Sequence, residues 1–234
     1  VVHGKCSLIE KIPGTIENKF ATLRAFYSYM IAHPGKKLLF MGQEFAQFKE
    51  WNFEEELDWQ LLEFDNHRKM QLFVQKLNKF YCNTSSFWEN DDSWEGFNWI
   101  SHDDNTQSVI AFRRIDRSGN EIVAVCNFVP VKRVDYKIGV PEKGRYKLVF
   151  NSDAIEFGGS GLSQKSWKTI DYAMHGYDQC ISMTLAPLSV VFLKLSSPAK
   201  KKDDKEIKES VEKKTALKEN LDKLQVEKEN YNLL

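Results

Sequence analysis

The sequence predicts an α/β segment followed by an all-β domain, and three observations along its 234 residues lead to this fold class. In the first 90 residues, apolar side chains at helical spacing flank one short apolar run. From about residue 94, short alternating runs are separated by turn signals. After Pro198 the composition changes to a tail rich in lysine and glutamate. We therefore expect three regions, covering residues 1–90, 91–198 and 199–234.

The first region begins with a predicted helix over residues 17–32, because apolar side chains recur there every three or four residues. These side chains are Phe20, Leu23, Tyr27, Met30 and Ile31. Pro34 ends the helix, since proline cannot continue it and biases His33 away from helical dihedral angles. A second helix is expected after residue 64, with Met70, Phe73, Val74, Leu77 and Phe80 or Tyr81 on one face.

Between these helices, residues 38–41 predict one strand that is buried on both faces. The run is too short for a helix, follows Pro34-Gly35 and ends at Gly42. Gln43 and Glu44 come next, at the end of a strand where α/β barrels carry their chemistry. A single strand cannot close an eight-stranded barrel. We therefore expect this segment to lack strand partners within the chain and the first third to be unstable alone.

The second region shows the pattern of an antiparallel β-sandwich. Expected strands cover residues 97–100, 108–113, 121–128, 134–139, 144–150 and the stretch 179–195. Ser118-Gly119-Asn120 supplies a turn between two of them. Gly158-Gly-Ser-Gly161 lacks the Lys-Ser/Thr ending of a phosphate-binding loop, so it is interpreted as a flexible turn between strands.

The third region, residues 199–234, is interpreted as a charged helical tail or a partly disordered one. Its main apolar residues are Ile207, Val211, Leu217, Leu221, Leu224 and Tyr231. Their spacing supports a helix but keeps only an imperfect heptad. The apolar stripe is short and Thr215 weakens it, which favours a solvated tail over a coiled-coil partner site.

Composition argues against several classes of function. The formal net charge is zero, so no whole-chain field favours nucleic acid or anionic lipid. No apolar stretch approaches the roughly 20 residues that span a bilayer, and we expect a cytoplasmic protein. The four cysteines are widely separated and have no metal-ligand spacing. Reduced structural thiols are therefore favoured, without a metal site, and no cofactor is indicated.

Several long motifs carry a family resemblance. They are Val1-Val-His-Gly-Lys5, the run from Pro34 to Ala46, Lys49-Glu-Trp-Asn52, Leu57-Asp-Trp59 and Trp94-Glu-Gly-Phe-Asn-Trp99. Together they closely resemble the 1,4-α-glucan (glycogen) branching enzymes of the α-amylase superfamily, glycoside hydrolase family 13, over roughly residues 1–196. The resemblance implies the C-terminal remnant of a (β/α)8 barrel followed by an all-β domain. It also implies an α-glucan partner such as glycogen or amylose-like chains.

The resemblance also implies where the chemistry of the family lies. Val1-Val-His-Gly-Lys5 follows, in that family, a His-Asp-Glu triplet at the end of the seventh barrel strand. The triplet, the nucleophilic aspartate and the acid/base glutamate all fall ahead of Val1. Glycosyl transfer with retention needs two carboxyl groups across the scissile bond. We therefore assign no catalytic residue and expect the isolated chain to be inactive.

Five residues remain as candidates for binding substrate. His3 and Lys5 lie in the loop that borders the cleft in the complete enzyme, although a frayed terminus is the simpler interpretation. Glu44 follows the predicted strand, and either orients substrate or hydrogen-bonds the Trp51-Asn52 loop. Trp51 and Trp59 offer apolar ring faces to glucose, although packing explains a large tryptophan near a barrel rim more often.

A second aromatic group has two interpretations. Trp94, Phe97 and Trp99 open the β-domain and either form a surface site for α-glucan or bury against the second helix at a seam between domains. The seam is favoured, because Trp99 begins a strand with apolar neighbours.

Three hypotheses for the whole chain follow. The first is the C-terminal part of a branching enzyme. The second is a non-catalytic α-glucan-binding or protein-interaction module. The third is a chain that reconstitutes an enzyme with a separate polypeptide carrying the missing N-terminal part of the barrel.

Overall fold

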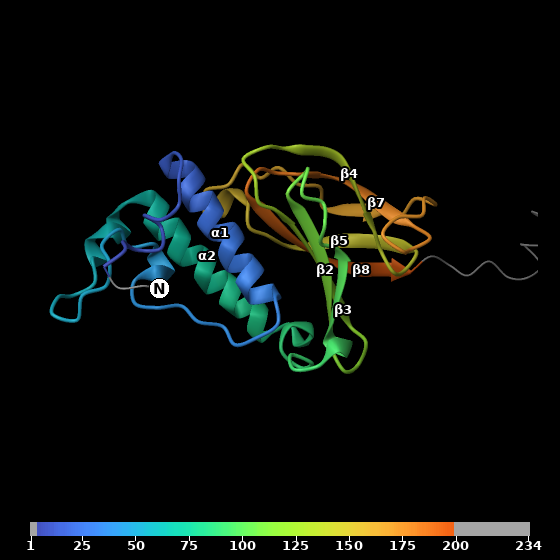
Figure 1. Ribbon diagram of the computed structural model, residues 1–234, viewed down its shortest axis with the longest axis horizontal. Helices are drawn as coiled ribbons and strands as arrows, with labels where there is room; N and C mark the ends of the chain where they lie inside the picture. The colour runs from blue at the N-terminus through green and yellow to red at the C-terminus, as the bar shows by residue number, and fades with distance from the viewer. Residues whose placement is uncertain (1–3, 199–234) are drawn as a thin grey trace, which may run out of the picture. The chain divides into compact units, whose positions relative to one another are not determined.

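The computed structural model describes residues 4–198, which lie within one compact unit. Two long helices, α1 (Ile16–Ala32) and α2 (Asp65–Cys82), run side by side and cover one side of the β-strands (Figure 1). The strands are β1 (Phe97–Ser101), β2 (Val109–Ile115), β3 (Glu121–Asn127), β4 (Arg133–Gly139), β5 (Gly144–Asn151), β6 (Ser166–Lys168), β7 (Cys180–Leu185) and β8 (Ser189–Pro198). Short 3-10 helices are η1 (Gln43–Phe45), η2 (Trp59–Glu63), η3 (Ser85–Phe87), η4 (Trp94–Gly96) and η5 (Ile155–Phe157).

Both predicted helices are confirmed, with bounds that follow from local chemistry. The Thr15 side chain accepts the Asn18 N–H at the start of α1, which is a standard N-cap. α1 ends at Ala32, two residues before Pro34. The buried face of α2 consists of His67, Met70, Phe73, Val74 and Leu77. Apolar spacing found all of these except His67.

The strands form an antiparallel sandwich, which confirms the predicted all-β class. Six strands make one sheet in the order β1-β2-β3-β8-β5-β6, and β4 pairs with β7 in a second sheet. Alternate residues of β3 face opposite sides. Val123 and Val125 pack toward the small sheet with Ile138 and Ile181, whereas Ala124 belongs to the core shared with the helices. The large sheet is therefore buried on both faces, and its central strand is almost wholly apolar.

Two details of the β-domain differ from the prediction. The stretch 179–195 is two strands, β7 and β8, because Leu188 takes a left-handed conformation with φ 48° in the connection between them. β6 has only three residues and pairs with β5 from Arg145 to Lys147. So short a strand carries too few residues for a periodic signal.

Residues 38–41 do not form the predicted strand within the described chain, where strand partners are absent as expected. Residues 36–40 have no regular secondary structure, and Leu38 is 73% exposed. Within residues 4–198 no hydrogen bond engages the backbone N–H or C=O groups of residues 36–39. A strand exists only when neighbouring strands accept its backbone bonds, and the described residues supply none here.

Arg114 on β2 joins the helices to the sheet. Its side chain is fully buried and donates to three backbone carbonyls, those of Ala32 at 2.7 Å, Phe87 at 3.1 Å and Gly96 at 3.1 Å. It also forms an ion pair with Asp91 at 2.8 Å. One guanidinium thus satisfies backbone carbonyls at the end of α1 and in two connecting segments, which have no regular ladder of backbone hydrogen bonds.

The same cluster holds the segment that leaves α1. The second carboxylate oxygen of Asp91 accepts the Gly35 N–H at 3.1 Å. The Lys37 ammonium donates to the His33 carbonyl and lies 5.7 Å from the centre of the Tyr81 ring. Burial lowers the pKa of Lys37 to about 8, although the nearby Asp91 carboxylate opposes this shift.

Replacing Arg114 by leucine should destabilise the fold strongly. The change leaves buried carbonyls and a carboxylate without their donor, a loss of about 3–5 kcal/mol for a broken buried pair. Urea unfolding followed by circular dichroism measures it, with Arg114→Lys as an intermediate variant that keeps the charge. Arg117→Leu is the exposed control and should change stability by less than about 0.5 kcal/mol. Equal stability of the Arg114→Leu and Arg117→Leu variants would contradict the role given to Arg114.

Lys37 should make stability depend on pH in the alkaline range. Its pKa is lower in the folded chain than in the unfolded chain, so the unfolded chain binds more protons between about pH 8 and its ordinary pKa of 10.5. The contribution of Lys37 to the free energy of unfolding therefore rises with pH across this window. Urea unfolding at pH 7.5 and pH 9.5 gives the free energy of unfolding of wild type and of Lys37→Met. The value for wild type, relative to that for Lys37→Met, should be higher at pH 9.5 than at pH 7.5. A difference that does not change with pH contradicts this.

Candidate functional site

The candidate site is the turn from Gly42 to Gln47, which carries the polar residues that follow the predicted barrel strand. Gly42 and Ala46 are both left-handed, with φ 79° and 60°, and they bracket η1. Positive φ is costly for alanine, so the surrounding structure must hold Ala46 there. An added Cβ at Gly42 would lie 2.9 Å from the Gln47 side chain, so the glycine is also needed for space.

Hydrogen bonds from three directions fix this turn. The Tyr27 hydroxyl on α1 donates to the Gln43 carbonyl at 3.0 Å. The Gln43 side-chain oxygen accepts the Phe40 N–H at 3.0 Å. From α2, the His67 ring nitrogen Nδ1 lies 2.8 Å from the Phe45 carbonyl, which as an acceptor requires an Nδ1–H donor. The turn is therefore clamped by both helices without a strand beneath it.

The buried Gln47 side chain connects the turn to the loop that follows. Its oxygen accepts the Asp58 N–H at 2.8 Å, and its nitrogen donates to the Lys49 carbonyl at 3.2 Å. Lys49 in turn pairs with Glu55 at 3.4 Å and Asp58 at 3.7 Å. These bonds hold the acidic loop beside the turn.

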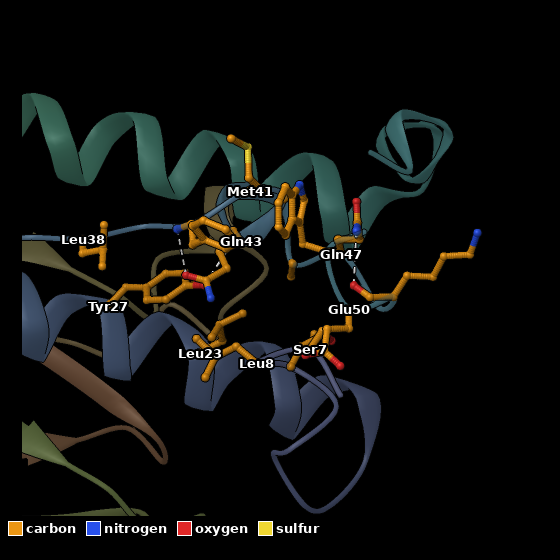
Figure 2. A pocket seen from close by; sticks show the side chains of 15 residues that line it. Ser7, Leu8, Leu23, Tyr27, Leu38, Met41, Gln43, Gln47 and Glu50 are labelled. Atoms are coloured by element: carbon orange, nitrogen blue, oxygen red, sulfur yellow. Dashed lines mark hydrogen bonds between the residues drawn. The ribbon is translucent and has the colours of Figure 1, made fainter. Parts of the chain in front are cut away.

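A cavity of about 380 Å³ opens beside the turn (Figure 2). Leu8, Leu23, Tyr27, Leu38 and Met41 supply much of its apolar lining. Gln43, Gln47, Lys49 and Glu50 give it polar groups on the side of the turn. Burial, followed by the charge of nearby Glu44, raises the pKa of Tyr27, so its hydroxyl stays protonated and keeps donating.

The five predicted binding residues are dispersed. Trp51 lines the cavity and its ring stands edge-on to Phe40 at 5.2 Å. Trp59 and Glu44 are not among the lining residues; the Trp59 ring is half-exposed and lies 5.2 Å from Phe45. Lys5 is exposed outside the cavity, and His3 lies outside the described residues. No hydrogen bond joins Glu44 to the Trp51-Asn52 loop within residues 4–198, so that interpretation is wrong.

Sequence reasoning missed the residues that hold the turn. Apolar spacing predicts Tyr27 only as an apolar member of the first helix, and Gln47 and His67 give no periodic signal. Their importance comes from burial, at 5% exposure for Gln47 and 4% for His67, which sequence alone does not report. Buried polar side chains need partners, and here the partners are backbone groups of the turn.

The second aromatic group forms a seam with α1 rather than with α2. Phe97 is buried, and its ring lies 5.4 Å from both His33 and Phe112. Trp99 is 39% exposed and stacks edge-on against Phe97 at 4.9 Å. Trp94 projects into solvent at 85% exposure. The predicted seam is therefore real for Phe97, its expected contact with the second helix is wrong, and Trp94 takes no part in it.

The glycine turn at residues 158–161 is held in place by hydrogen bonds to Asp153. The Asp153 carboxylate accepts one hydrogen bond from the Ser160 N–H at 3.0 Å and another from the Ser160 hydroxyl at 2.5 Å. The Gly161 N–H donates to the Asp153 carbonyl at 2.8 Å. The segment connects β5 to β6 as predicted, but these bonds contradict its description as flexible.

Other chemical features of residues 4–198 are few. No group of three or more His, Cys, Asp or Glu side chains gathers there closely enough to hold a metal ion. The four cysteines are free, and Cys126 and Cys180 are buried in β3 and β7. No helix in this part of the chain is both long and apolar enough to cross a membrane. The predicted tail at 199–234 lies outside the described residues.

Comparison with known proteins shows what the chain is similar to. Residues 99–196 match the alpha amylase C-terminal all-beta domain. A 1,4-alpha-glucan branching enzyme of Aquifex aeolicus is 52% identical over 196 residues, and that of Halothermothrix orenii is 49% identical over 198. Each match covers 83% of this chain and 31% of the relative. The chain thus spans about a third of the length of these relatives.

A solved structure gives the same fold. The crystal structure of the Group B Streptococcus pullulanase SAP superimposes with a TM-score of 0.50 at 15% identity, over 77% of this chain and 28% of that one. At that identity the likeness concerns the fold alone. The identity to the curated relatives is far higher, and over 83% of its length this chain is similar in sequence to the C-terminal part of 1,4-alpha-glucan branching enzymes.

Proposed function

We propose that the chain serves as the C-terminal part of a branching enzyme that forms α-1,6 branches in an α-glucan such as glycogen. The reaction implied by the family cleaves an α-1,4 bond through a covalent glycosyl-enzyme and passes the glucan to a 6-hydroxyl. The observation that carries this proposal is the 52% identity to a branching enzyme over 196 residues. A cytoplasmic location belongs to the same proposal.

The proposal assigns residues 38–41 to the last strand of a (β/α)8 barrel. Three observations support it. The segment lies in the chain between two helices that pack on each other, the backbone groups of Leu38 and Leu39 have no hydrogen-bond partner within residues 4–198, and Leu38 and Met41 expose apolar side chains. Neighbouring parallel strands would satisfy the backbone and cover the side chains. The partner is therefore the N-terminal part of the barrel, in the same polypeptide or in a second one.

In the completed barrel the clamped turn would face the substrate. Polar groups at the C-terminal end of a barrel strand border the active site of such enzymes. Trp51 is the best-placed of the candidate binding residues, because it lines the cavity beside that turn. Glu44, Trp59, Lys5 and His3 remain proposals for the rim of the site. None of these residues is assigned a role in bond breaking.

The chain alone should leave the iodine absorbance of amylose unchanged. Joined behind the part of the Aquifex aeolicus enzyme that precedes the matched region, it should shift that absorbance as branching proceeds. The reason is that the fusion supplies both the two carboxyl groups and the strands that the proposal requires. A reproducible shift by the 234-residue chain alone, or a folded and inactive fusion, contradicts the proposal.

Within the active fusion, Trp51→Ala should lower kcat/KM by about tenfold, equivalent to about 1.4 kcal/mol of transition-state stabilisation. Trp94→Ala is the matched control: it removes the same side chain from a fully solvated position and should change kcat/KM less than twofold. Thermal unfolding of both variants separates lost packing from lost binding. Equal effects of the two substitutions on kcat/KM would contradict a role for Trp51 in the site.

A non-catalytic glucan-binding role is the second candidate. The exposed rings of Trp88, Trp94 and Trp99 favour it, since sugar rings pack on aromatic faces. Affinity electrophoresis of the 234-residue chain in gels containing glycogen tests this role. Retarded migration that is lost in the Trp94→Ala or Trp99→Ala variant would support a binding module, and migration independent of glycogen would exclude it.

A further inference from the structure

We propose that residues 171–178, here called the latch hairpin, form a latch that opens in acid. The neutral imidazole of His175 holds the tip of the latch hairpin against the end of β4, and the protonated ring releases it. β4 and β7 lie on the side of the large sheet away from α1 and α2 (Figure 1). The contacts that hold the latch hairpin are made inside the β-domain, so the latch does not depend on the proposed barrel.

The tip of the latch hairpin is a tight two-residue turn. Met174 and Tyr177 exchange backbone hydrogen bonds at 2.9 and 3.0 Å. Between them, His175 and Gly176 are left-handed, with φ 53° and 79°, as in a type I′ turn. Histidine adopts this conformation more often than most residues. The turn therefore sets the direction in which the His175 side chain leaves the backbone.

The His175 ring is the acceptor for a buried backbone donor. The Val140 N–H donates to the Gln179 carbonyl, so the N–H of the neighbouring Gly139 points away from β7. Gly139 is buried, and its N–H donates to His175 Nδ1 at 3.2 Å. Nδ1 therefore carries a lone pair, and the proton of the neutral ring lies on Nε2. In the imidazolium both nitrogens carry protons, so this hydrogen bond is lost and a buried donor is left without an acceptor.

The tip fits against β4 because residue 139 is glycine. An added Cβ at Gly139 would lie 2.1 Å from the Met174 carbonyl oxygen and 3.1 Å from the Tyr177 ring. The backbone of the tip thus lies directly against the strand. Gly139 stays buried only while the tip is in place, so exposure of its N–H reports opening.

The base of the latch hairpin is held by bonds that do not titrate. Ile170 and Cys180 exchange backbone hydrogen bonds at 2.9 and 3.1 Å. The Gln179 side-chain nitrogen donates to the carbonyls of Val140 and Pro141 at 2.6 and 2.8 Å. Acid therefore acts on the tip, and the opening is a local movement about a fixed base.

The surroundings of the ring couple its protonation to opening. Burial lowers the pKa of His175 below its ordinary value of 6.5, and the carboxylates of Asp103 and Asp104 oppose this shift. Asp104 already accepts the Tyr136 hydroxyl at 2.6 Å, whereas Asp103 is exposed and offers the imidazolium an anionic neighbour. A ring released to solvent binds a proton more readily than the ring of the closed tip. The closed tip therefore loses stability as the pH falls below 6.5.

Other charged groups near the latch hairpin engage other residues of it. Lys137 on β4 lies 4.4 Å from the centre of the Tyr172 ring. Arg113 on β2 donates to the Tyr177 hydroxyl at 3.3 Å and pairs with Glu121 at 3.0 Å. Burial raises the pKa of Glu121. An opening driven by Glu121 would persist without the His175 ring, which separates the two sources.

Nuclear magnetic resonance of the full 234-residue chain tests the latch between about pH 7.5 and about pH 5, the range in which histidine titrates. The His175 ring should titrate with a midpoint below 6.5. The hydrogen-exchange protection factor of the Gly139 amide should fall about tenfold over the same transition, as expected for the loss of one buried hydrogen bond. The Val140 amide, bonded at the base, should keep its protection.

Three substitutions identify the titrating group. His175→Asn tolerates the left-handed turn but does not titrate, so Gly139 protection should no longer change with pH. His102→Asn is the matched control, because His102 is exposed and contacts the Trp99 ring, and it should keep the wild-type transition. Asp103→Asn removes a carboxylate that favours the imidazolium and should move the His175 midpoint to lower pH.

Four results would overturn the proposal. They are Gly139 protection that does not follow the His175 titration, a transition that persists in His175→Asn, loss of protection at Val140 together with Gly139, and a His175 midpoint above 6.5. The last result would mean that the proton favours the closed tip. Far-ultraviolet circular dichroism of each variant at both ends of the pH range confirms that an open tip is not a lost fold.

Discussion

The buried guanidinium of Arg114 is the interaction on which the arrangement of this chain depends. Helices and sheets each satisfy their own backbone, but the segments that join them do not. Here the end of α1, the connection through Phe87 and the loop at Gly96 all present carbonyls to one side chain from β2. The charge is matched by Asp91, which also holds the chain as it leaves α1. A single arginine thus sets where the helical pair meets the sheet.

The two-sided burial of the large sheet follows from that placement. One face packs on the small sheet and the other on α1 and α2, where Phe80, Phe150 and Phe192 stack against one another. The helices are not covered by the sheet alone, because α2 also contacts η1 and η2. Leu38 and Met41 remain exposed beside the cavity that α1 borders, and the proposed barrel strand concerns this surface.

The extent to which the sequence predicts this structure varies with the physical origin of each element. Periodic burial predicts α1, α2 and most strands, because each has one or two continuous apolar faces. It fails at 38–41, where the residues favour a strand but no strand within residues 4–198 pairs with them. It also fails at 179–195, where a left-handed Leu188 divides one apolar stretch into two strands. Such a conformation depends on tertiary contacts.

The sequence predicts where the candidate site lies along the chain, but not which side chains hold it in place. The motif from Pro34 to Ala46 located the turn, and Trp51, one of the five candidate residues, lines the cavity. The roles of Tyr27, Gln47 and His67 depend on where three distant segments meet, and no local pattern contains that information. Glu44 and Trp59 show the converse case, since both lie near the turn in sequence but outside the cavity lining.

The clamped turn has a consequence for assembly. Both helices already hold Gly42 to Gln47 in a conformation with two left-handed residues, and no strand or substrate is needed to create it. Ordering a flexible loop at the moment of docking would consume part of the binding free energy, at about 1–2 kcal/mol for each backbone residue fixed. This entropy has already been lost during folding of the chain itself. Whatever polypeptide or glucan meets the turn therefore meets a rigid surface, and the fit is selective for shape.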